Sequence, residues 1–256
     1  MTFGEAGKNA VRTTSLKDCQ DILDIYIKHG GREIDTARVY GEDRSTPFEE
    51  TLRAADTLYR EGKFEQFGLS NFAAWEVSEI ATLAKVHNLI RPSIYQAMYN
   101  GLTRAIEEEL VPCLRYWNIR LVVYNPLAGG LLTGKIQPNN QDAILPGSRF
   151  DLSSTSSTMA KMYQERYFRQ NYFDAIDLIK KAVDQQKITL VEAALRWLQH
   201  HSVLTENDGV IIGASSASQL EANYLDSAKG PLPKEIVEAI DSAWLLIKGH
   251  DPLYWR

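Results

Sequence analysis

An aspartate and a tyrosine five residues apart, Asp35 and Tyr40, are the first pair of side chains in this sequence that could do chemistry together. Ile34 indicates a short strand that ends at Asp35, and Tyr40 follows on the loop that leaves this strand. A carboxylic acid and a phenol near the end of one strand make a start for a proton-transfer site. The spacing alone is weak evidence, because such pairs are common by chance.

Polar side chains follow other short apolar runs in the same way. These runs alternate with amphipathic segments, which favours a mainly parallel sheet covered by helices. No Gly-x-Gly-x-x-Gly follows the first strand, so a (β/α)8 barrel is favoured over a dinucleotide-binding Rossmann fold. Barrels of this kind carry their sites at the carboxyl ends of the strands. The polar residues at predicted strand ends are Asp35, Tyr40, Ser70, Asn71, Gln96, Asn125 and Ser215.

The bulk composition fits one globular domain that covers residues 1–256. The chain has 44% hydrophobic and 24% charged residues and a net charge of −5, which argues against a nucleic-acid partner. No apolar run reaches the ~18 residues that a membrane helix needs. The first residues show no secretory signal. We therefore expect a cytoplasmic domain of the size of an enzyme.

Five motifs in a fixed order carry a resemblance to a known family. They are Asp-x-x-x-x-Tyr (35–40), Gly-Leu-Ser-Asn (68–71), the Gln96 segment Tyr-Gln-Ala-Met-Tyr-Asn (95–100), Tyr-Asn-Pro-Leu-Ala-Gly-Gly-Leu-Leu-Thr-Gly-Lys (124–135) and Gly-Ala-Ser-Ser-Ala-Ser-Gln-Leu-Glu-Ala-Asn (213–223). Together they resemble the aldo-keto reductase superfamily, and within it the aflatoxin-aldehyde reductase branch. The resemblance covers nearly the whole chain.

This resemblance implies a (β/α)8 barrel that reduces aldehydes or ketones to alcohols with NADPH. Tyr40 would donate the proton to the carbonyl oxygen, and Asp35 would orient the site. A homodimer is an arrangement that the resemblance allows, and no metal is implied.

The resemblance also assigns contacts along the NADPH molecule. The nicotinamide carboxamide would be held by Ser70, Asn71 and Gln96, and its ring would stack on Tyr124. The pyrophosphate would lie along Asn125, Leu127 and Gly129, and the 2′-phosphate would meet Lys135 and Arg149. The adenosine end would contact Ser215, Gln219 and Asn223. A hydroxyl and amides suit a carboxamide, and a cation suits a phosphate.

The sequence departs from the family pattern after Tyr40. The family uses an Asp, a Tyr, a Lys and a His, and only the first two are found here. Residues 41–45 stand where the family has a helix, a strand, a helix and a strand, so about two βα units, or roughly 60 residues, are missing. We therefore predict an incomplete barrel, internally truncated between 41 and 46, with either unpaired strand edges or a re-closed sheet.

Several alternatives stay open at this point. The chain could be an active reductase, an NADPH-binding relative that acts by binding, or a truncated product that folds poorly. Ser70 and Asn71 could cap a helix, Asn125 could make a plain turn, Tyr124 could be a core residue, and Lys135 could be a solvated charge.

Overall fold

The structure, a computed structural model, describes residues 33–35, 46–136, 144, 148–152, 157–212 and 217–255, with the backbone alone at 33–35, 157–159 and 217–220. Tyr40 and Ser215, two of the predicted site residues, lie outside these residues. None of the described helices is long and apolar enough to cross a membrane.

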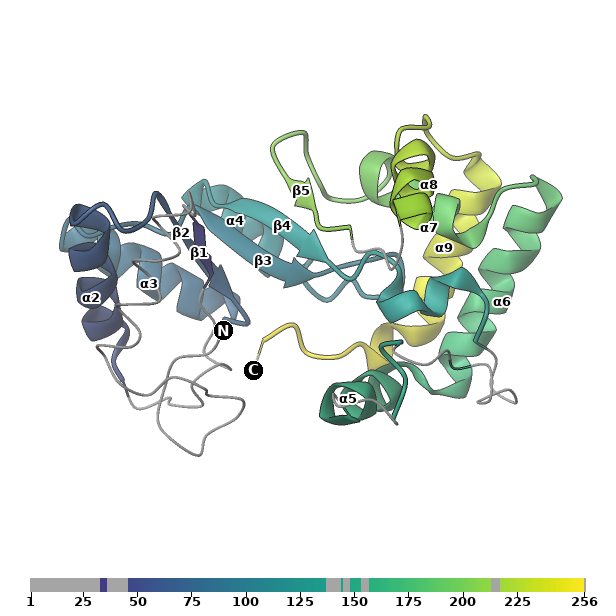
Figure 1. The fold of residues 1–256 in the computed structure, drawn as a ribbon, viewed down its shortest axis with the longest axis horizontal. Coiled ribbons are helices and arrows are strands. Elements are labelled where there is room, and N and C mark those ends of the chain that lie inside the picture. Colours follow the sequence, from purple (N-terminus) through teal and green to yellow (C-terminus); the bar gives the residue numbers. More distant parts are fainter. Residues whose placement is uncertain are drawn as a thin grey trace. The chain divides into compact units, whose positions relative to one another are not determined.

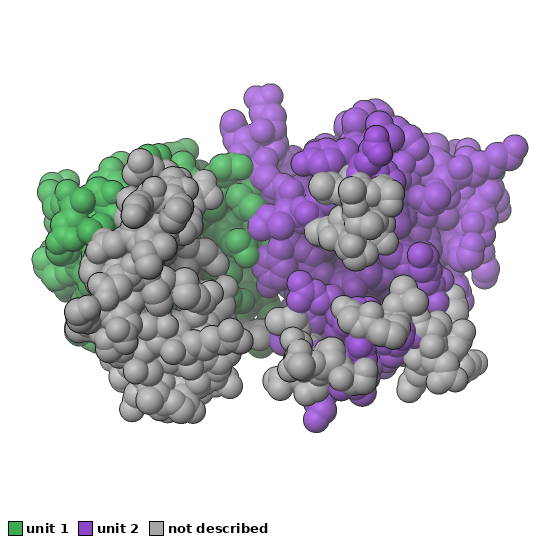
Figure 2. Space-filling model, viewed as in Figure 1, with its two compact units in different colours: residues 1–97, 106–122, 253–256 green, residues 98–105, 123–252 purple. Residues whose placement is uncertain are grey.

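The chain divides into two compact units, which Figure 2 colours separately. Unit 1 contains residues 1–97, 106–122 and 253–256, and unit 2 contains residues 98–105 and 123–252. Each unit is described by itself below, and the expectation of a single functional domain stays a prediction.

Unit 1 alternates strands and helices along the chain, as the sequence predicts for an α/β protein. Its elements are β1 (Glu33–Asp35), α2 (Phe48–Arg60), β2 (Gln66–Ser70), α3 (Ala74–Val86), β3 (Ile94–Met98), α4 (Leu110–Trp117) and β4 (Arg120–Tyr124), with the last residue of β3 and the last two of β4 assigned to unit 2. Figure 1 shows α3 and α4 beside β2 and β3, and α3 packs against both α2 and α4.

The strand order in the sheet is β1-β2-β3-β4-β5, which follows the order in the sequence. The pairs β1·β2 and β2·β3 are parallel. The strand that carries Asp35 thus pairs directly with the strand that carries Ser70, so β1 and β2 do not face each other across a gap. Of the two outcomes expected for an incomplete barrel, the structure has the re-closed sheet at this point.

Helix α2 begins where the sequence predicts, but its cap differs. The N-cap position is Pro47, and no side chain caps it, whereas Thr46 was expected to do so. The fixed φ of proline suits the start of a helix, so Pro47 defines this end without a side-chain hydrogen bond.

Helix α4 is shorter than predicted. The apolar spacing of Ile106, Leu110 and Leu114 predicts a helix from Thr103 that bends at Pro112, but α4 begins at Leu110, so Pro112 lies in its first turn. There its missing N–H and its ring disrupt no intrahelical bond. Ile106 is buried as predicted, but it belongs to the turns before the helix.

Unit 2 is mainly helical. Its elements are the 3-10 segment η2 (Ala128–Thr133), α5 (Ser157–Tyr167), α6 (Gln170–Gln185), α7 (Leu190–His200), β5 (Gly209–Val210), α8 (Ala217–Ser227), α9 (Lys234–Ile247) and the short η4 (Lys248–His250). Helix α6 packs along α9, and α7 packs on α8. Apolar spacing in the sequence predicts helices close to α6, α7, α8 and α9 and a strand at β5, whereas the long irregular stretch over about 136–158 gives no sign of α5.

The core of unit 2 is rich in aromatic side chains. Phe150 lies edge-on to Tyr163 and stacks on Phe168, with centroid distances of 5.8 and 5.1 Å. Tyr167 is fully buried and contacts Tyr172 edge to face. These contacts fix α5 and the start of α6 beside the loop that follows β4.

Candidate functional site

The pairing of β2 with β3 brings two of the predicted site residues together in unit 1. Ser70 is the last residue of β2, and it is the register partner of Gln96 on β3. Ser70 is 3% exposed, and Gln96 is half-buried. Register partners of parallel strands point to the same face of the sheet, so a hydroxyl and a carboxamide lie side by side there.

The end of β1 adjoins the same part of the sheet. Asp35, the last residue of β1, is paired with Gly68, two residues before Ser70. The backbone therefore places Asp35 one strand away from the Ser70–Gln96 pair. The Asp35 side chain lies outside the described residues.

Asn71 extends this polar cluster. Its backbone is left-handed, with φ 64°, a conformation that asparagine tolerates better than most residues. The Asn71 Nδ2 donates a hydrogen bond of 3.1 Å to the Ser70 Oγ.

The alternative that Ser70 and Asn71 serve as a helix cap is not what the structure contains. The N-cap of α3 is Ala73, whose N–H donates to the Glu76 carboxylate at 2.8 Å. The next amide, that of Ala74, donates to the Tyr254 hydroxyl at 3.1 Å. The start of α3 is thus satisfied by Glu76 and Tyr254.

In unit 2, Asn125 organises the loop that follows β4. Its backbone is left-handed, with φ 65°. Its Oδ1 accepts the Gly129 N–H at 2.5 Å, and its Nδ2 donates to the Tyr167 hydroxyl at 2.8 Å. The Asn125 carbonyl accepts from the Asn100 side chain and from the Ala128 N–H, both at 3.0 Å. This is more than a plain turn, because one side chain joins Gly129 of the loop to Tyr167 of α5.

Gly129 is a position where only glycine fits. Its φ is 71°, and a Cβ built there would lie 2.6 Å from the Tyr163 ring. Its N–H is already used by Asn125, so the contribution that Gly129 could make to a ligand is the absence of a side chain. Leu127 supports the same turn, because its carbonyl accepts from the amides of Gly130 and Leu132.

The remaining predicted cofactor residues of unit 2 are spread along the chain. Tyr124 is half-buried at the end of β4, and its carbonyl accepts from the Tyr99 N–H at 3.2 Å. Lys135 is exposed just after the glycine-rich loop, and Arg149 is exposed in a turn. Asn223 is 7% exposed on α8. Gln219 is also on α8, but its side chain lies outside the described residues.

Asn100 and Tyr167, which no sequence motif assigned to the site, also contact this loop through Asn125. Asn100 is buried and is the second residue after β3, whereas Asn71 and Asn125 directly follow β2 and β4. Tyr167 comes from α5, and burial raises the pKa of its hydroxyl, so it stays protonated. The repeated asparagine after a strand is a signal that could have identified Asn100, whereas nothing in the sequence pairs Tyr167 with Asn125.

The catalytic lysine and histidine have no replacement at the described strand ends. No lysine or histidine occurs within the described strands or as the residue next after β2, β3, β4 or β5. His200 and His201 lie at the end of α7 and bond to backbone groups of residues 229 and 232. Within the described residues, no cluster of His, Cys, Asp and Glu could hold a metal ion.

Comparisons with known proteins give the family context of this geometry. The model of the Aldo/keto reductase family matches residues 41–245. The match begins at the residue after Tyr40, where the sequence analysis places the junction.

Individual relatives match over most of the chain. Aflatoxin B1 aldehyde reductase member 2 of Mus musculus is 45% identical over 229 residues, which cover 87% of this chain and 61% of the mouse protein. Aldo-keto reductase family 7 member A3 of Homo sapiens is 44% identical over 229 residues, covering 87% and 68%. Aldo-keto reductase pigE of Monascus ruber is 40% identical over 230 residues, covering 89% and 66%. The chain thus spans about two thirds of the length of these relatives.

Proposed function

Because the chain belongs to the aldo/keto reductase family, whose fold here is an incomplete (β/α)8 barrel, we propose that it is an NADPH-dependent oxidoreductase that reduces aldehydes or ketones to alcohols. The observation that supports this most directly is the register of β2 and β3, which pairs Ser70, the last residue of β2, with Gln96 in the middle of β3. The setting we propose is the cytoplasm.

The residues of unit 1 suit the nicotinamide end of the cofactor. A carboxamide offers one acceptor oxygen and two N–H donors, and the Ser70 hydroxyl and the Asn71 and Gln96 amides can satisfy both kinds of group. The buried setting of Ser70 makes each of these hydrogen bonds stronger than it would be in water.

The residues of unit 2 suit the phosphates and the adenosine end. Tyr124 offers a ring for stacking, and Lys135 and Arg149 offer exposed cations for the 2′-phosphate. Asn125 would act mainly by shaping the loop, since its carboxamide is engaged by Gly129 and Tyr167. The loop backbone, free of a side chain at Gly129, would then lie against the pyrophosphate.

The proposed chemistry needs one proton. NADPH, when bound, supplies a hydride to the carbonyl carbon of the substrate. The oxygen that gains negative charge is protonated by the Tyr40 hydroxyl in our proposal, and Asp35 orients the site. A neighbouring cation would make the phenol a stronger acid, and none is found at the carboxyl ends of the described strands. We therefore expect slow turnover, lower than that of an intact relative by about 10²–10⁴.

The test is to mix the purified protein with NADPH and 4-nitrobenzaldehyde and to follow the absorbance of the reduced cofactor. We expect slow oxidation that is lost in Tyr40→Phe and kept in Tyr116→Phe, a change at a tyrosine that is 78% exposed on α4. Equal rates in the two variants would exclude Tyr40 as the proton donor.

A second candidate function is binding of NADPH without turnover, which the absence of lysine and histidine from the described strand ends favours. Saturable NADPH binding with no oxidation of the cofactor would support this function over the first. If NADPH at millimolar concentration neither binds nor raises the melting temperature, both proposals are wrong.

A further inference from the structure

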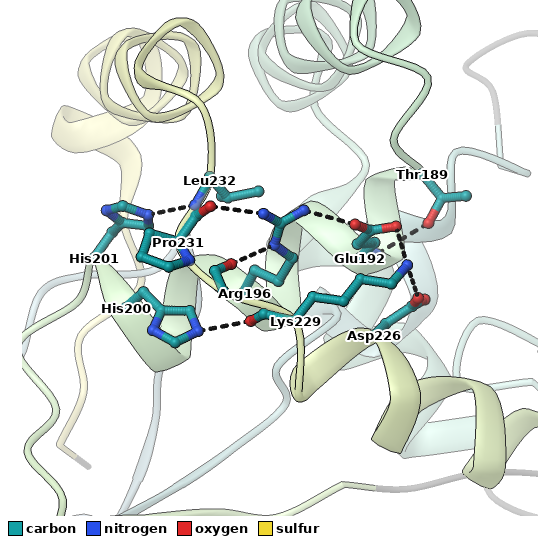
Figure 3. A network of polar contacts seen from close by, with 10 residues as sticks. Thr189, Glu192, Arg196, His200, His201, Asp226, Lys229, Pro231 and Leu232 are labelled. Carbon is teal, nitrogen blue, oxygen red and sulfur yellow. Dashed lines mark hydrogen bonds and ion pairs between the residues drawn. The ribbon is translucent and has the colours of Figure 1, made fainter.

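A network of charged side chains joins α7 to the loop between α8 and α9 (Figure 3). Its centre is Glu192, which is 8% exposed. The Glu192 carboxylate accepts hydrogen bonds from the Arg196 guanidinium and the Lys229 ammonium, both at 2.7 Å. Lys229 also pairs with Asp226 in the last turn of α8, at 2.9 Å. Glu192 itself is fixed at the start of α7, where its N–H donates to the Thr189 hydroxyl.

Arg196 binds the backbone of the loop as well as Glu192. Its Nε donates to the Gly230 carbonyl at 2.7 Å, and its Nη2 donates to the Pro231 carbonyl at 2.6 Å. One planar guanidinium thus donates hydrogen bonds to three groups, the Glu192 carboxylate and the two loop carbonyls. A lysine would keep the charge, but it could not reproduce this geometry.

The two histidines at the end of α7 complete the attachment. The His200 Nε2 donates to the Lys229 carbonyl, and the His201 Nε2 accepts from the Leu232 N–H, each at 2.8 Å. Gln199 donates to the Ser227 hydroxyl at 3.0 Å, at the last residue of α8. Four consecutive residues, 229–232, are therefore bonded to side chains of α7.

The helix that these contacts hold is the one that carries Asn223 and Gln219. Asn223 lies one turn before Asp226 and is 7% exposed, so its position depends on how α8 is seated on α7. Burial raises the pKa of Glu192, but the hydrogen bonds from Lys229 and Arg196 outweigh it and hold that pKa below its ordinary value. Glu192 therefore remains ionised near neutral pH, and the network stays intact.

We propose that Glu192, Arg196 and Lys229 are positioning residues, which fix α8 so that Asn223 can contact the adenosine end of NADPH. This inference rests on the proposed function, since it assigns α8 to the same cofactor. It predicts that weakening the network lowers affinity for the adenosine half of the cofactor and leaves affinity for the nicotinamide half unchanged.

The experiment measures binding of 2′,5′-ADP, of reduced nicotinamide mononucleotide and of NADPH to the full chain by calorimetry. Arg196→Lys should raise the Kd for 2′,5′-ADP and for NADPH by roughly 3- to 30-fold, and the Kd for the mononucleotide should not change. The matched control is Lys180→Met, which removes the exposed i, i+4 ion pair with Asp184 on α6 and should change none of the three constants.

A second variant covers the case in which Arg196→Lys does not fold. Glu192→Gln keeps the shape of the side chain but removes the charge that faces Arg196 and Lys229, and the same selective loss is expected. If a folded variant binds 2′,5′-ADP as the wild type does, or loses all three ligands equally, the positioning role is wrong. If the wild type binds none of the three ligands, the proposed function fails and this inference fails with it.

Discussion

At the scale of single residues, the loop after β4 is set by a glycine whose neighbour is an aromatic ring. Gly129→Ala should destabilise the protein because it adds a Cβ at φ 71°, where that atom would lie 2.6 Å from the Tyr163 ring. A left-handed alanine costs about 1–2 kcal/mol, and overpacking adds about 1–3 kcal/mol. Urea unfolding measures the sum.

Gly62→Ala is the control for this change. Gly62 has the same φ of 71°, but nothing lies within 4 Å of its added Cβ. It should therefore show the backbone cost alone. If Gly129→Ala is no more destabilising than Gly62→Ala, then Tyr163 moves aside freely and does not constrain the loop.

His201 makes the stability of unit 2 depend on pH. Burial, together with His200 and Arg196, lowers the pKa of His201 below its ordinary value of 6.5, with Asp241 opposing the shift. The neutral ring accepts the Leu232 N–H. Below pH 6.5 the unfolded chain therefore binds more protons than the folded one. The contribution of His201 to the free energy of unfolding is complete above that pH, and it falls as the pH decreases towards the folded pKa.

The measurement is urea unfolding at pH 7.5 and at pH 5.5 (about one unit on either side of the ordinary value). The wild type should lose stability at the lower pH, and His201→Gln, which keeps an acceptor but cannot titrate, should lose less. His250→Gln removes an exposed histidine near the end of the chain and should behave as the wild type. An equal loss in the wild type and in His201→Gln would show that other groups carry the dependence.

At the scale of elements, the start of α3 depends on a side chain from the other end of the chain. Tyr254 accepts the Ala74 N–H at 3.1 Å and donates to the Glu109 carboxylate. Tyr254→Phe leaves both partners without the hydroxyl, so unit 1 should lose about 1–3 kcal/mol of stability.

Hydrogen exchange at the Ala74 amide measures this effect directly, because the amide would lose its acceptor. Tyr224→Phe makes the same chemical change at a tyrosine that is 64% exposed on α8, and it should have no effect on α3. Unchanged protection of the Ala74 amide in Tyr254→Phe would mean that Glu76 alone holds this helix end.

Most elements could be predicted from local patterns, and the misses have physical causes. The bounds predicted for β4 and α9, 120–124 and 234–247, agree with the structure because apolar spacing and flanking residues coincide there. The start of α4 was misplaced because Ile106 continues the helical spacing although it lies in turns. Helix α5 was missed because its tyrosines gain their partners from distant segments, Phe150 and Asn125.

The candidate site was predictable to a similar degree. The strand-end positions of Ser70 and Asn125 follow from alternation of strands and helices, which the sequence displays, whereas Gln96 was expected near the end of its strand and lies in the middle of β3. Local patterns could not predict the register of Ser70 with Gln96, because it depends on pairing between distant segments. The same holds for the hydrogen bonds at both ends of the Asn125 carboxamide. The network around Glu192 likewise joins residues more than thirty positions apart.

At the scale of the whole molecule, the chain is an incomplete barrel in which β1 is followed by α2 and then by the parallel strand β2. If about two βα units are missing after Tyr40, supplying them should restore the absent lysine and histidine. A chimera with the corresponding segment of the mouse relative inserted between residues 41 and 46 should reduce 4-nitrobenzaldehyde about 10²–10⁴ times faster. A chimera that folds and binds NADPH but turns over no faster would show that the slow step lies elsewhere.

The direct pairing of β1 with β2 also bears on how such a chain can change in length. One strand and the helix that follows it form a module, and the strands on either side of such a module can pair in parallel with the same hydrogen-bonding pattern, as β1 and β2 do. Whole modules can therefore be gained or lost between β1 and β2 without reversing the direction of any later strand. Loss of a strand without its helix would instead reverse the direction of the next strand. Proteins of this architecture should therefore differ in length by whole modules.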